Sequence, residues 1–395
     1  MNLTGKKQMI GFFLSEGFQL DESSLNYLLN YTSRAGEIVA FMKEAHPGAT
    51  TITSDSLKDF LEPNNFNIDF IKSSHPINKP YTTSMISNYL GSRYDFLQGV
   101  LQKRMELVNL TSISKIGQTQ QFSLIILIRE IDYTTGEIVV EDKTGSTKLH
   151  FTNESGIYHL AKDEVIGVVC HQHNNKIMIK NIVHPDININ REIKREKDGI
   201  VCVFLSVSNL EKEIAEHDFH QNLHKQLASF DENKLCIFVM DDNSNTSQGI
   251  EELKQHLPGK SRKFLLTRSQ QHHDGFINLE DPATIKIGTT TIFLSSGTFL
   301  KEYDEIFKMM TDSTLINLIK KRHLNPTFKI NNEIYEKDPY LLDIIPDIIA
   351  VGSAKAPNTI NYKGIMVLVN GSFTTTPVFW GVNLQTREAI KIDFT

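Results

Sequence analysis

The segment IVCVFLSVS, residues 200–208, is an apolar run that ends in small polar residues, and it sets the pattern of the C-terminal half of the chain. Comparable apolar runs, separated by helical stretches, lie at residues 235–240, 264–267, 291–294, 348–351 and 365–369. Long apolar strands alternating with helices predict a layered α/β domain covered on both faces. In such a domain the functional loops follow the carboxyl ends of the strands, so the residues after each run are the candidates for a site.

Residues 117–187 have a different character, with short apolar runs and turn signals. About five strands are expected, at residues 122–128, 137–141, 148–151, 165–170 and 176–179. Asp142-Lys143-Thr144-Gly145 predicts a hairpin turn in which Gly145 adopts a positive φ. Short strands joined in this way predict a small closed barrel of the OB type.

The remaining segments complete a multidomain α+β organisation. Apolar residues at helical spacing predict a small helical N-terminal module over residues 1–62 and a helical lead-in over residues 81–116. Residues 63–80 are rich in Asn, Ser and Pro and read as a linker. The charged run of residues 188–198 is interpreted as a solvated connector, and residues 199–395 form the α/β domain.

Composition limits the partners and the compartment. The net charge of -6 gives no general attraction to phosphate, so any contact with DNA is expected to be shared with a partner. The three cysteines lie far apart in apolar runs, which suits reduced thiols in an intracellular protein. No stretch approaches the length of a membrane span, and we expect a cytoplasmic, nucleoid-associated protein.

Several local strings follow the linear order of one known family. Three of them precede or open the expected barrel: Ser92-Arg93-Tyr94, Lys103-Arg104 and Ser112-Ile113-Ser114-Lys115. Four lie in the C-terminal domain: Arg322-His323-Leu324-Asn325-Pro326-Thr327, Pro346-Asp347-Ile348 followed by Gly352, Tyr362-Lys363-Gly364, and Asn370-Gly371-Ser372. Over residues 86–395 the chain resembles the small subunit of archaeal family-D DNA polymerases and, more widely, the B-subunits of replicative polymerases.

That resemblance implies an OB domain combined with a calcineurin-like phosphoesterase domain. Active phosphoesterases of this kind hydrolyse phosphodiesters between two cations about 3.5–4 Å apart, which requires a bridging carboxylate and several imidazoles. By the resemblance, Ser206 and Ser208 stand where the active pattern has Asp-x-His. Asp242 stands at the bridging carboxylate, and Asn245 stands at the second aspartate of that motif.

The later motifs are altered in the same way. His272 stands at the asparagine of the Gly-Asn-His-Asp motif, whereas His273 and Asp274 keep its histidine and aspartate. Ser296 replaces a histidine, and Ser353 and Lys355 replace both histidines of the final Gly-His-x-His. The loss of so many donors predicts that no metal pair and no other cofactor is bound. As a hypothesis, Lys355 replaces the metal as the charge that neutralises Asp242 or Asp274.

Other polar clusters have simpler interpretations. His217, His220 and His224 share a helix face and could bind a metal, but they fit a solvated stripe better. His171 and His173 are interpreted as surface residues. Lys320-Lys321-Arg322 could touch phosphate or could complement a helix C-terminus.

The preferred interpretation is a catalytically silent small subunit of a replicative, family-D-like DNA polymerase, a partner of the large catalytic subunit and not an enzyme by itself. By the resemblance, its two larger domains together would bind the C-terminal region of that large subunit. The alternative is an active metal-dependent 3′–5′ exonuclease or phosphodiesterase with a divergent ligand set, namely Asp242, His272, His273, Asp274 and His217. A third interpretation, an independent single-strand binding barrel, is disfavoured by the scarcity of aromatic residues interleaved with basic ones in residues 122–179.

Overall fold

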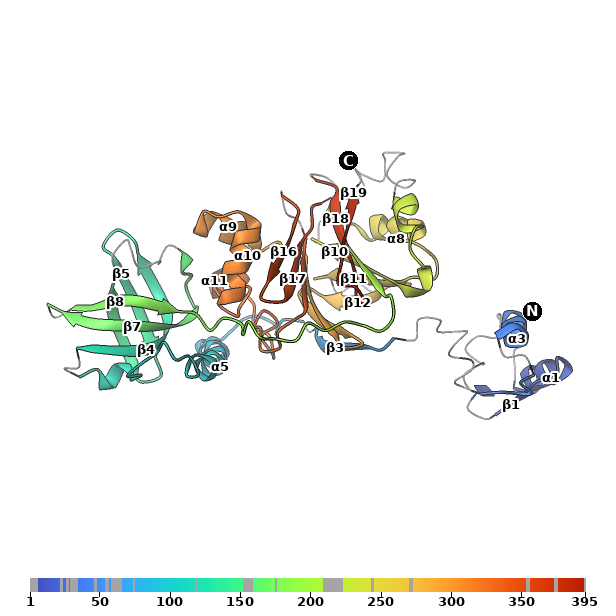
Figure 1. Ribbon diagram of the computed structural model, residues 1–395, viewed down its shortest axis with the longest axis horizontal. Helices are drawn as coiled ribbons and strands as arrows, with labels where there is room; N and C mark the ends of the chain where they lie inside the picture. Colours follow the sequence, from blue (N-terminus) through green and yellow to red (C-terminus); the bar gives the residue numbers. More distant parts are fainter. Residues whose placement is uncertain are drawn as a thin grey trace. The chain divides into compact units, whose positions relative to one another are not determined.

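A computed structural model describes most of the chain, and Figure 1 shows the arrangement of its elements. The described residues are 6–21, 24–25, 28, 35–45, 48–53, 57, 66–73, 75–117, 120–151, 159–174, 176–208, 223–242, 245–269, 273–352, 356–372 and 376–393. The chain divides into two compact units, Met1–Asn67 and Ile68–Thr395. Within the described residues, no helix has both the length and the apolar character that a membrane crossing requires.

The first unit contains helices α1 (Lys6–Ser15) and α3 (Ala35–Ala45) and a two-stranded parallel sheet of β1 (Gln19–Leu20) and β2 (Thr51–Ile52). Met9 and Phe13 of α1 pack with Ile38 and Met42 of α3 and with Ile52 in one apolar core. The helical character predicted for residues 1–62 is therefore present, together with a short sheet that the helical spacing did not indicate.

The second unit begins with an edge strand, where the sequence suggested a linker. Residues 68–72 form β3 (Ile68–Lys72), which pairs antiparallel with β13 (Ala283–Ile287). Lys72 Nζ also donates to the carbonyls of Asp338 and Leu341, at 3.1 and 2.9 Å. The predicted linker of residues 63–80 is thus wrong for this part, because an edge strand gains backbone hydrogen bonds without needing a periodic apolar pattern.

The barrel is closed by five strands in the order β4-β5-β6-β8-β7. They are β4 (Gln121–Asp132), β5 (Glu137–Asp142), β6 (Gly145–His150), β7 (Val165–His173) and β8 (Lys176–Val183), and the barrel follows helix α5 (Thr83–Leu101) and the 3₁₀ turn η2 (Ile113–Lys115). In β4, Leu124 and Ile126 face the barrel core, whereas Ile125 and Leu127 pack against α5. Burial on both faces explains why β4 reads as a continuous apolar run rather than an alternating one.

The hairpin between β5 and β6 forms where it was predicted, but its geometry differs. Gly145 starts β6 and is not among the glycines with positive φ. Instead, Asp142 Oδ1 accepts hydrogen bonds from the backbone N–H groups of Thr144 and Gly145, at 2.7 and 3.1 Å. The aspartate side chain fixes this turn, so a left-handed glycine is not required.

The α/β domain is a sandwich of two six-stranded mixed sheets. One sheet has the order β12-β11-β10-β9-β18-β19, and the other has the order β16-β17-β15-β14-β13-β3. The strands of the first sheet are β9 (Val201–Val207), β10 (Leu235–Asp241), β11 (Arg262–Thr267), β12 (Ile277–Glu280), β18 (Val378–Asn383) and β19 (Ala389–Asp393). Besides β13 and β3, the second contains β14 (Thr290–Ser295), β15 (Ile348–Val351), β16 (Asn358–Tyr362) and β17 (Ile365–Val369).

Helices cover the outer faces of this sandwich (Figure 1). Helix α8 (Ser247–His256) packs Ile250 and Leu253 against the first sheet. Helices α9 (Leu300–Phe307) and α10 (Thr311–Lys320) pack Tyr303, Leu315 and Leu318 against the second, and short α11 (Phe328–Asn331) follows. The 3₁₀ turn η4 (Glu232–Lys234) leads into β10.

The predicted fold class, a mixed α+β chain with an OB-type barrel and an α/β sandwich, is confirmed. All six apolar runs quoted for the C-terminal domain are strands of the sandwich. The strands that the pattern did not indicate include β12, β16 and β19, whose residues are largely exposed or half-buried. Such strands have no continuous apolar run to mark them.

The connector of residues 188–198 contains no helix or strand, but two of its charges are not simply solvated. Arg191 Nη2 lies 2.5 Å from Asp347 Oδ1, a carboxylate that is only 1% exposed. Glu196 Oε1 accepts four hydrogen bonds from the backbone and hydroxyl groups of Thr289 and Thr290. Both side chains tie the connector to the sandwich, a role that the mixed-sign run alone does not indicate.

Candidate functional site

The carboxyl ends of the parallel strands in the two sheets converge. A Cβ at Gly352, directly after β15, would lie 2.3 Å from Ser206 Oγ of β9 and 2.9 Å from the carbonyl oxygen of Ser296 after β14. Only glycine fits this contact. The fold therefore brings Ser206 and Ser296 to one place, as expected if strand ends form the site. We call the group of Ser206, Ser208, Asp241, Asn245, Asp281 and Ser296 the carboxyl-edge cluster.

The buried carboxylate at the end of β10 is Asp241, which is 4% exposed. Asn245 Nδ2 donates to Asp241 Oδ1 at 2.6 Å, and Thr267 Oγ1 donates to Asp241 Oδ2 at 3.1 Å. Asp242, the position assigned to the bridging carboxylate, is half-buried, and its backbone N–H donates to the Val207 carbonyl. The structure thus places two adjacent carboxylates here. The buried one, Asp241, accepts hydrogen bonds from neutral amide and hydroxyl groups.

A second buried carboxylate, Asp281, was not indicated by the sequence. It is 3% exposed and accepts a hydrogen bond from Ser295 Oγ at 2.9 Å and another from Ser296 Oγ. Arg268 Nε lies 3.7 Å from Asp281 Oδ2. Burial opposes the charge on Arg268, but nearby Tyr340 and Asp281 outweigh it and raise the pKa of Arg268. The only local signal for this aspartate is its place before Pro282, at the end of a strand without an apolar run.

Ser208 also bonds within this region. Its hydroxyl shares a hydrogen bond with the hydroxyl of Ser372, which follows β17, and both side chains are buried. A serine in the position of a ligand therefore joins the two sheets. The hydroxyl groups of Ser208 and Ser296 therefore form hydrogen bonds with neighbouring protein groups.

The remaining candidates are only partly described. His273 is buried, and its Nδ1 lies 3.9 Å from Glu251 Oε1 of α8. Asp274 is exposed, and its carbonyl accepts a hydrogen bond from Lys254 Nζ at 2.6 Å. The other candidate positions, His272, Ser353 and Lys355, lie outside the described residues. The hypothesis that Lys355 neutralises Asp242 or Asp274 therefore stays a prediction.

The described residues of this edge do not supply the donors of a two-metal site. In the described ranges no group of three or more His, Cys, Asp or Glu side chains is arranged so that it could hold a metal ion. The two buried carboxylates, Asp241 and Asp281, each already bind hydroxyl or amide donors. Serine hydroxyls are neutral and do not replace the imidazole and carboxylate ligands that such a site requires.

Three of the other histidine candidates lie within the described residues. His224 is exposed, whereas His217 and His220 fall outside the described part of the chain. His173 is exposed at the end of β7, and His171 is half-buried in the same strand.

Lys321 and Arg322 turn inward. Lys321 Nζ lies 2.5 Å from Glu164 Oε2, and these side chains are 0% and 1% exposed. Arg322 donates to the Leu342 carbonyl at 2.8 Å. Neither side chain is placed to bind phosphate at the surface. For these two residues of the Lys320–Arg322 run, the structure therefore does not support the phosphate interpretation.

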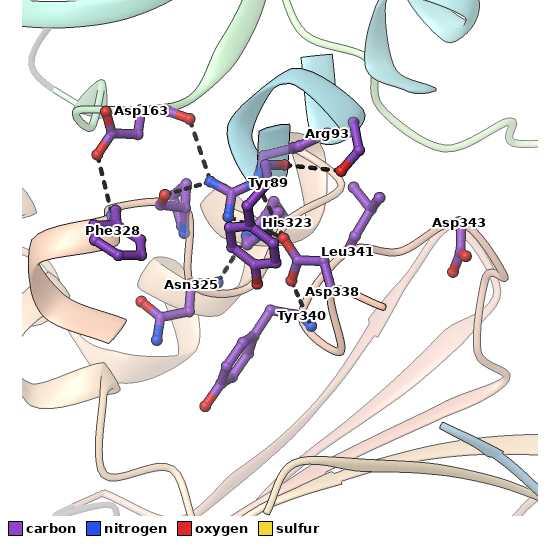
Figure 2. Close-up of polar contacts among 12 residues, drawn as sticks. Tyr89, Arg93, Asp163, His323, Asn325, Phe328, Asp338, Tyr340, Leu341 and Asp343 are labelled. Carbon is purple, nitrogen blue, oxygen red and sulfur yellow. Dashed lines mark hydrogen bonds and ion pairs between the residues drawn. The ribbon is translucent and has the colours of Figure 1, made fainter. Parts of the chain in front are cut away.

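A second polar cluster joins α5 and the barrel to the sandwich, and Figure 2 shows its centre. Arg93 of α5 is 1% exposed. Its Nη2 and Nε donate to Asp338 Oδ2 at 2.9 and 3.2 Å, and its Nη1 donates to the Pro326 carbonyl at 2.5 Å and to the Asp163 carbonyl at 3.4 Å. His323 Nε2 lies 2.8 Å from the same Asp338 Oδ2. We call Arg93, Asp163, Glu164, Lys321, His323 and Asp338 the junction cluster.

Protonation states in the junction cluster follow from its hydrogen bonds. His323 Nδ1 accepts the backbone N–H of Asn325 at 3.2 Å, so its proton is on Nε2 and is donated to Asp338. Burial and the charge of Arg93 lower the pKa of His323 to about 4. Burial alone would raise the pKa of Asp338, but His323 and Arg93 outweigh it and hold the pKa well below its usual range. Within the cluster, Asp338 is therefore a buried carboxylate paired with one cation, Arg93, and one neutral imidazole, His323.

The junction cluster explains two of the strings that carried the family resemblance. Arg93 comes from Ser92-Arg93-Tyr94, and His323 and Pro326 come from Arg322-His323-Leu324-Asn325-Pro326-Thr327. The two strings lie more than two hundred residues apart, yet Arg93 binds the Pro326 carbonyl directly. Their partner, Asp338, was not singled out from the sequence, since a lone aspartate in a loop carries no local signal.

Comparisons with known proteins support the resemblance to polymerase small subunits. The chain is 24% identical over 347 residues to a protein named DNA polymerase II small subunit from Archaeoglobus fulgidus, a match that covers 72% of this chain and 69% of that protein. No protein-family model matches the chain.

Solved structures are similar to parts of the chain. An archaeal phosphodiesterase is 12% identical, and the match covers 49% of this chain and 99% of that one with a TM-score of 0.29. Vacuolar protein sorting 29 from Cryptosporidium parvum is 14% identical, over 49% of this chain and 95% of that one, with a TM-score of 0.28. The resemblance to the small subunits of archaeal family-D DNA polymerases, drawn from the sequence strings, is confirmed by the A. fulgidus relative.

Proposed function

We propose that this chain is a non-catalytic accessory subunit of a DNA polymerase, which binds and stabilises a large catalytic subunit during replication. The similarity to a DNA polymerase II small subunit supports the accessory role. The carboxyl-edge cluster is the observation that carries the non-catalytic part. Its buried carboxylates bind serine, threonine and asparagine side chains, whereas two-metal hydrolysis needs carboxylate and imidazole donors that bind cations.

The proposed partner supplies most of the contact with DNA. A net charge of -6 gives the chain no general attraction for a phosphate backbone. Among its described residues the barrel offers few aromatic platforms for bases, since Phe122 and Phe151 are buried and Tyr133 is half exposed. Binding to DNA through the complex would place the chain at the nucleoid.

Co-purification tests the accessory role. The full chain, carrying an affinity tag, is expressed in its native cells and isolated at physiological salt. We expect a large catalytic polymerase subunit to co-elute in near-equal amount, identified by mass spectrometry. A chain that elutes alone, while a polymerase large subunit is present in the same cells, would contradict the proposal.

The rival function is a metal-dependent exonuclease. Two observations favour it: His273 is buried, and the carboxylates of Asp241 and Asp242 are adjacent. The purified chain is incubated with Mn²⁺ and labelled single-stranded DNA. We expect no cleavage above that of a buffer control. Cleavage that disappears in both Asp242→Ala and His273→Ala would establish the enzyme instead.

A further inference from the structure

A groove remains at the carboxyl edge of the sandwich, beside the carboxyl-edge cluster. Its volume is about 510 Å³. Its described lining residues come from the positions next to the ends of β10, β14 and β15 and from α9 with the turn before α10. Gly297, Thr298, Leu300, Met309, Met310 and Ala356 supply much of its lining. This volume lies within the range of pockets that bind ligands or side chains of a partner.

The apolar part of the groove continues onto the open surface. Met310, one of the lining residues, is 64% exposed. Exposed methionine side chains are flexible and polarizable, and they are common on surfaces that adapt to peptide partners. The hydroxyl of Thr311 donates to Asp304 Oδ2 at 2.6 Å, which ties the turn before α10 to α9. The apolar side chains therefore sit on a fixed backbone.

The charged part of the lining is acidic. Asp242, Asp304 and Glu305 line the groove, and Lys301 is the one basic residue among its described lining positions. Excess carboxylate repels the phosphates of nucleic acid and favours cationic side chains. The combination of an apolar floor and an acidic rim is complementary to a peptide with apolar anchors flanked by Lys or Arg.

We propose that this groove, lying where a phosphoesterase would bind its substrate, docks a segment of a partner protein in which apolar side chains are flanked by basic ones. The proposal does not depend on the accessory function. It concerns the apolar and acidic lining of this groove and the chemistry of the segment that would bind there. It gives the edge of the sandwich a role in protein recognition in place of catalysis.

Selection from a library of random linear peptides displayed on phage tests this inference with the full chain. We expect enrichment of sequences that combine Leu, Phe or Met with Lys or Arg. Thr298 is exposed at the groove, so Thr298→Trp should fill it without disturbing the core. The best selected peptide, made synthetically and labelled, should bind Thr298→Trp at least about tenfold more weakly than the unaltered chain.

Two further variants complete the test. Glu305→Lys should weaken binding mainly at low salt, because an exposed rim charge acts through screened electrostatics. Thr135→Trp, on the barrel hairpin between β4 and β5, is the matched control and should bind as the unaltered chain does. Thermal unfolding of all three variants checks that they are folded.

Three outcomes would overturn the inference. The first is that no peptide is enriched, or that the enriched peptides are acidic. The second is that the selected peptide binds Thr298→Trp as tightly as it binds the unaltered chain. The third is that a single-stranded oligonucleotide binds the chain and loses that binding in Thr298→Trp, which would assign the groove to nucleic acid.

Discussion

The carboxyl-edge cluster and the junction cluster both bury carboxylates, but different groups neutralise them. At the carboxyl edge, neutral hydroxyl and amide groups donate hydrogen bonds to Asp241 and Asp281, and Arg268 Nε lies 3.7 Å from Asp281 Oδ2, beyond hydrogen-bond distance. At the junction, Asp338 binds the guanidinium of Arg93, and Glu164 binds the ammonium of Lys321. The edge lies on open strand ends, whereas the junction joins two domains in a fully buried interface.

This difference indicates which part of the chain must keep its charges. A buried carboxylate that loses a full opposite charge is left uncompensated, whereas one that loses a single neutral donor keeps its other partners. The junction should therefore tolerate substitution far less than the edge.

The largest effect is expected at Arg93. Arg93→Met leaves Asp338 buried without its cation, and we expect the free energy of unfolding to fall by about 3–5 kcal/mol. Urea denaturation measures the change. The control is Lys148→Met, because the Lys148 side chain is 65% exposed and lies 3.2 Å from Glu137, outside the junction cluster. An exposed pair of this kind contributes about 1 kcal/mol or less. Equal losses in the two variants would remove the distinction between junction and surface.

His323 should give the junction a pH dependence. Its pKa is about 4 in the folded chain against 6.5 in the unfolded one, so the unfolded chain binds more protons between these values. Stability is fully present above about pH 6.5 and falls as the pH drops toward 4, by about 3 kcal/mol from this residue.

The measurement compares the free energy of unfolding of the unaltered chain and of His323→Gln from pH 7 to pH 4.5. The slope should be shallower in the variant. His184, whose pKa burial lowers to about 3, contributes to the slope of both proteins and serves as the internal reference. Parallel curves would show that His323 does not stay neutral in the fold.

A smaller effect is expected at the carboxyl edge. Ser296→Ala removes one hydroxyl from Asp281, which keeps its hydrogen bond from Ser295. We expect a loss of about 2 kcal/mol, since hydrogen bonds to charged groups contribute about 1.5–3 kcal/mol. Ser229→Ala, at an exposed position, is the control and should stay within about 0.5 kcal/mol. A loss as large as that of Arg93→Met would show that the edge is held as tightly as the junction.

The smallest effect is expected from divalent metal. A ligand present at a hundred times its dissociation constant raises stability by about 2.7 kcal/mol, which a thermal scan detects readily. We expect Tm to change by less than about 1 °C between Mn²⁺ and EDTA. A Tm that EDTA lowers and Mn²⁺ restores would reveal a metal centre and would favour the exonuclease.

Much of the architecture was predictable from local pattern. The apolar runs at residues 200–205 and 235–240 are strands because each is buried on both faces. The barrel was indicated by short strands with a turn between residues 142 and 145. Edge strands such as β3 and β19 were missed because hydrogen bonding to a neighbour, rather than their own side chains, makes them strands.

The candidate site was predictable only in part. The position of the site followed from the rule that loops after parallel strands converge, and Ser206 and Ser296 do approach each other across Gly352. The identity of the buried carboxylates did not follow. Asp241 and Asp242 are neighbours in the sequence. Asp241 is the buried one because it is the last residue of β10, which the sequence pattern does not fix.

Residue type and order alone indicated the long buried strands, the likeness to polymerase small subunits and the serines at the positions that this likeness assigns to metal ligands. The tertiary structure alone decided which charges meet. Arg93, His323 and Asp338 are far apart along the chain, and no spacing rule connects them. Their pairing depends on the packing of α5 against the sandwich, and long-range packing is what local sequence patterns do not encode.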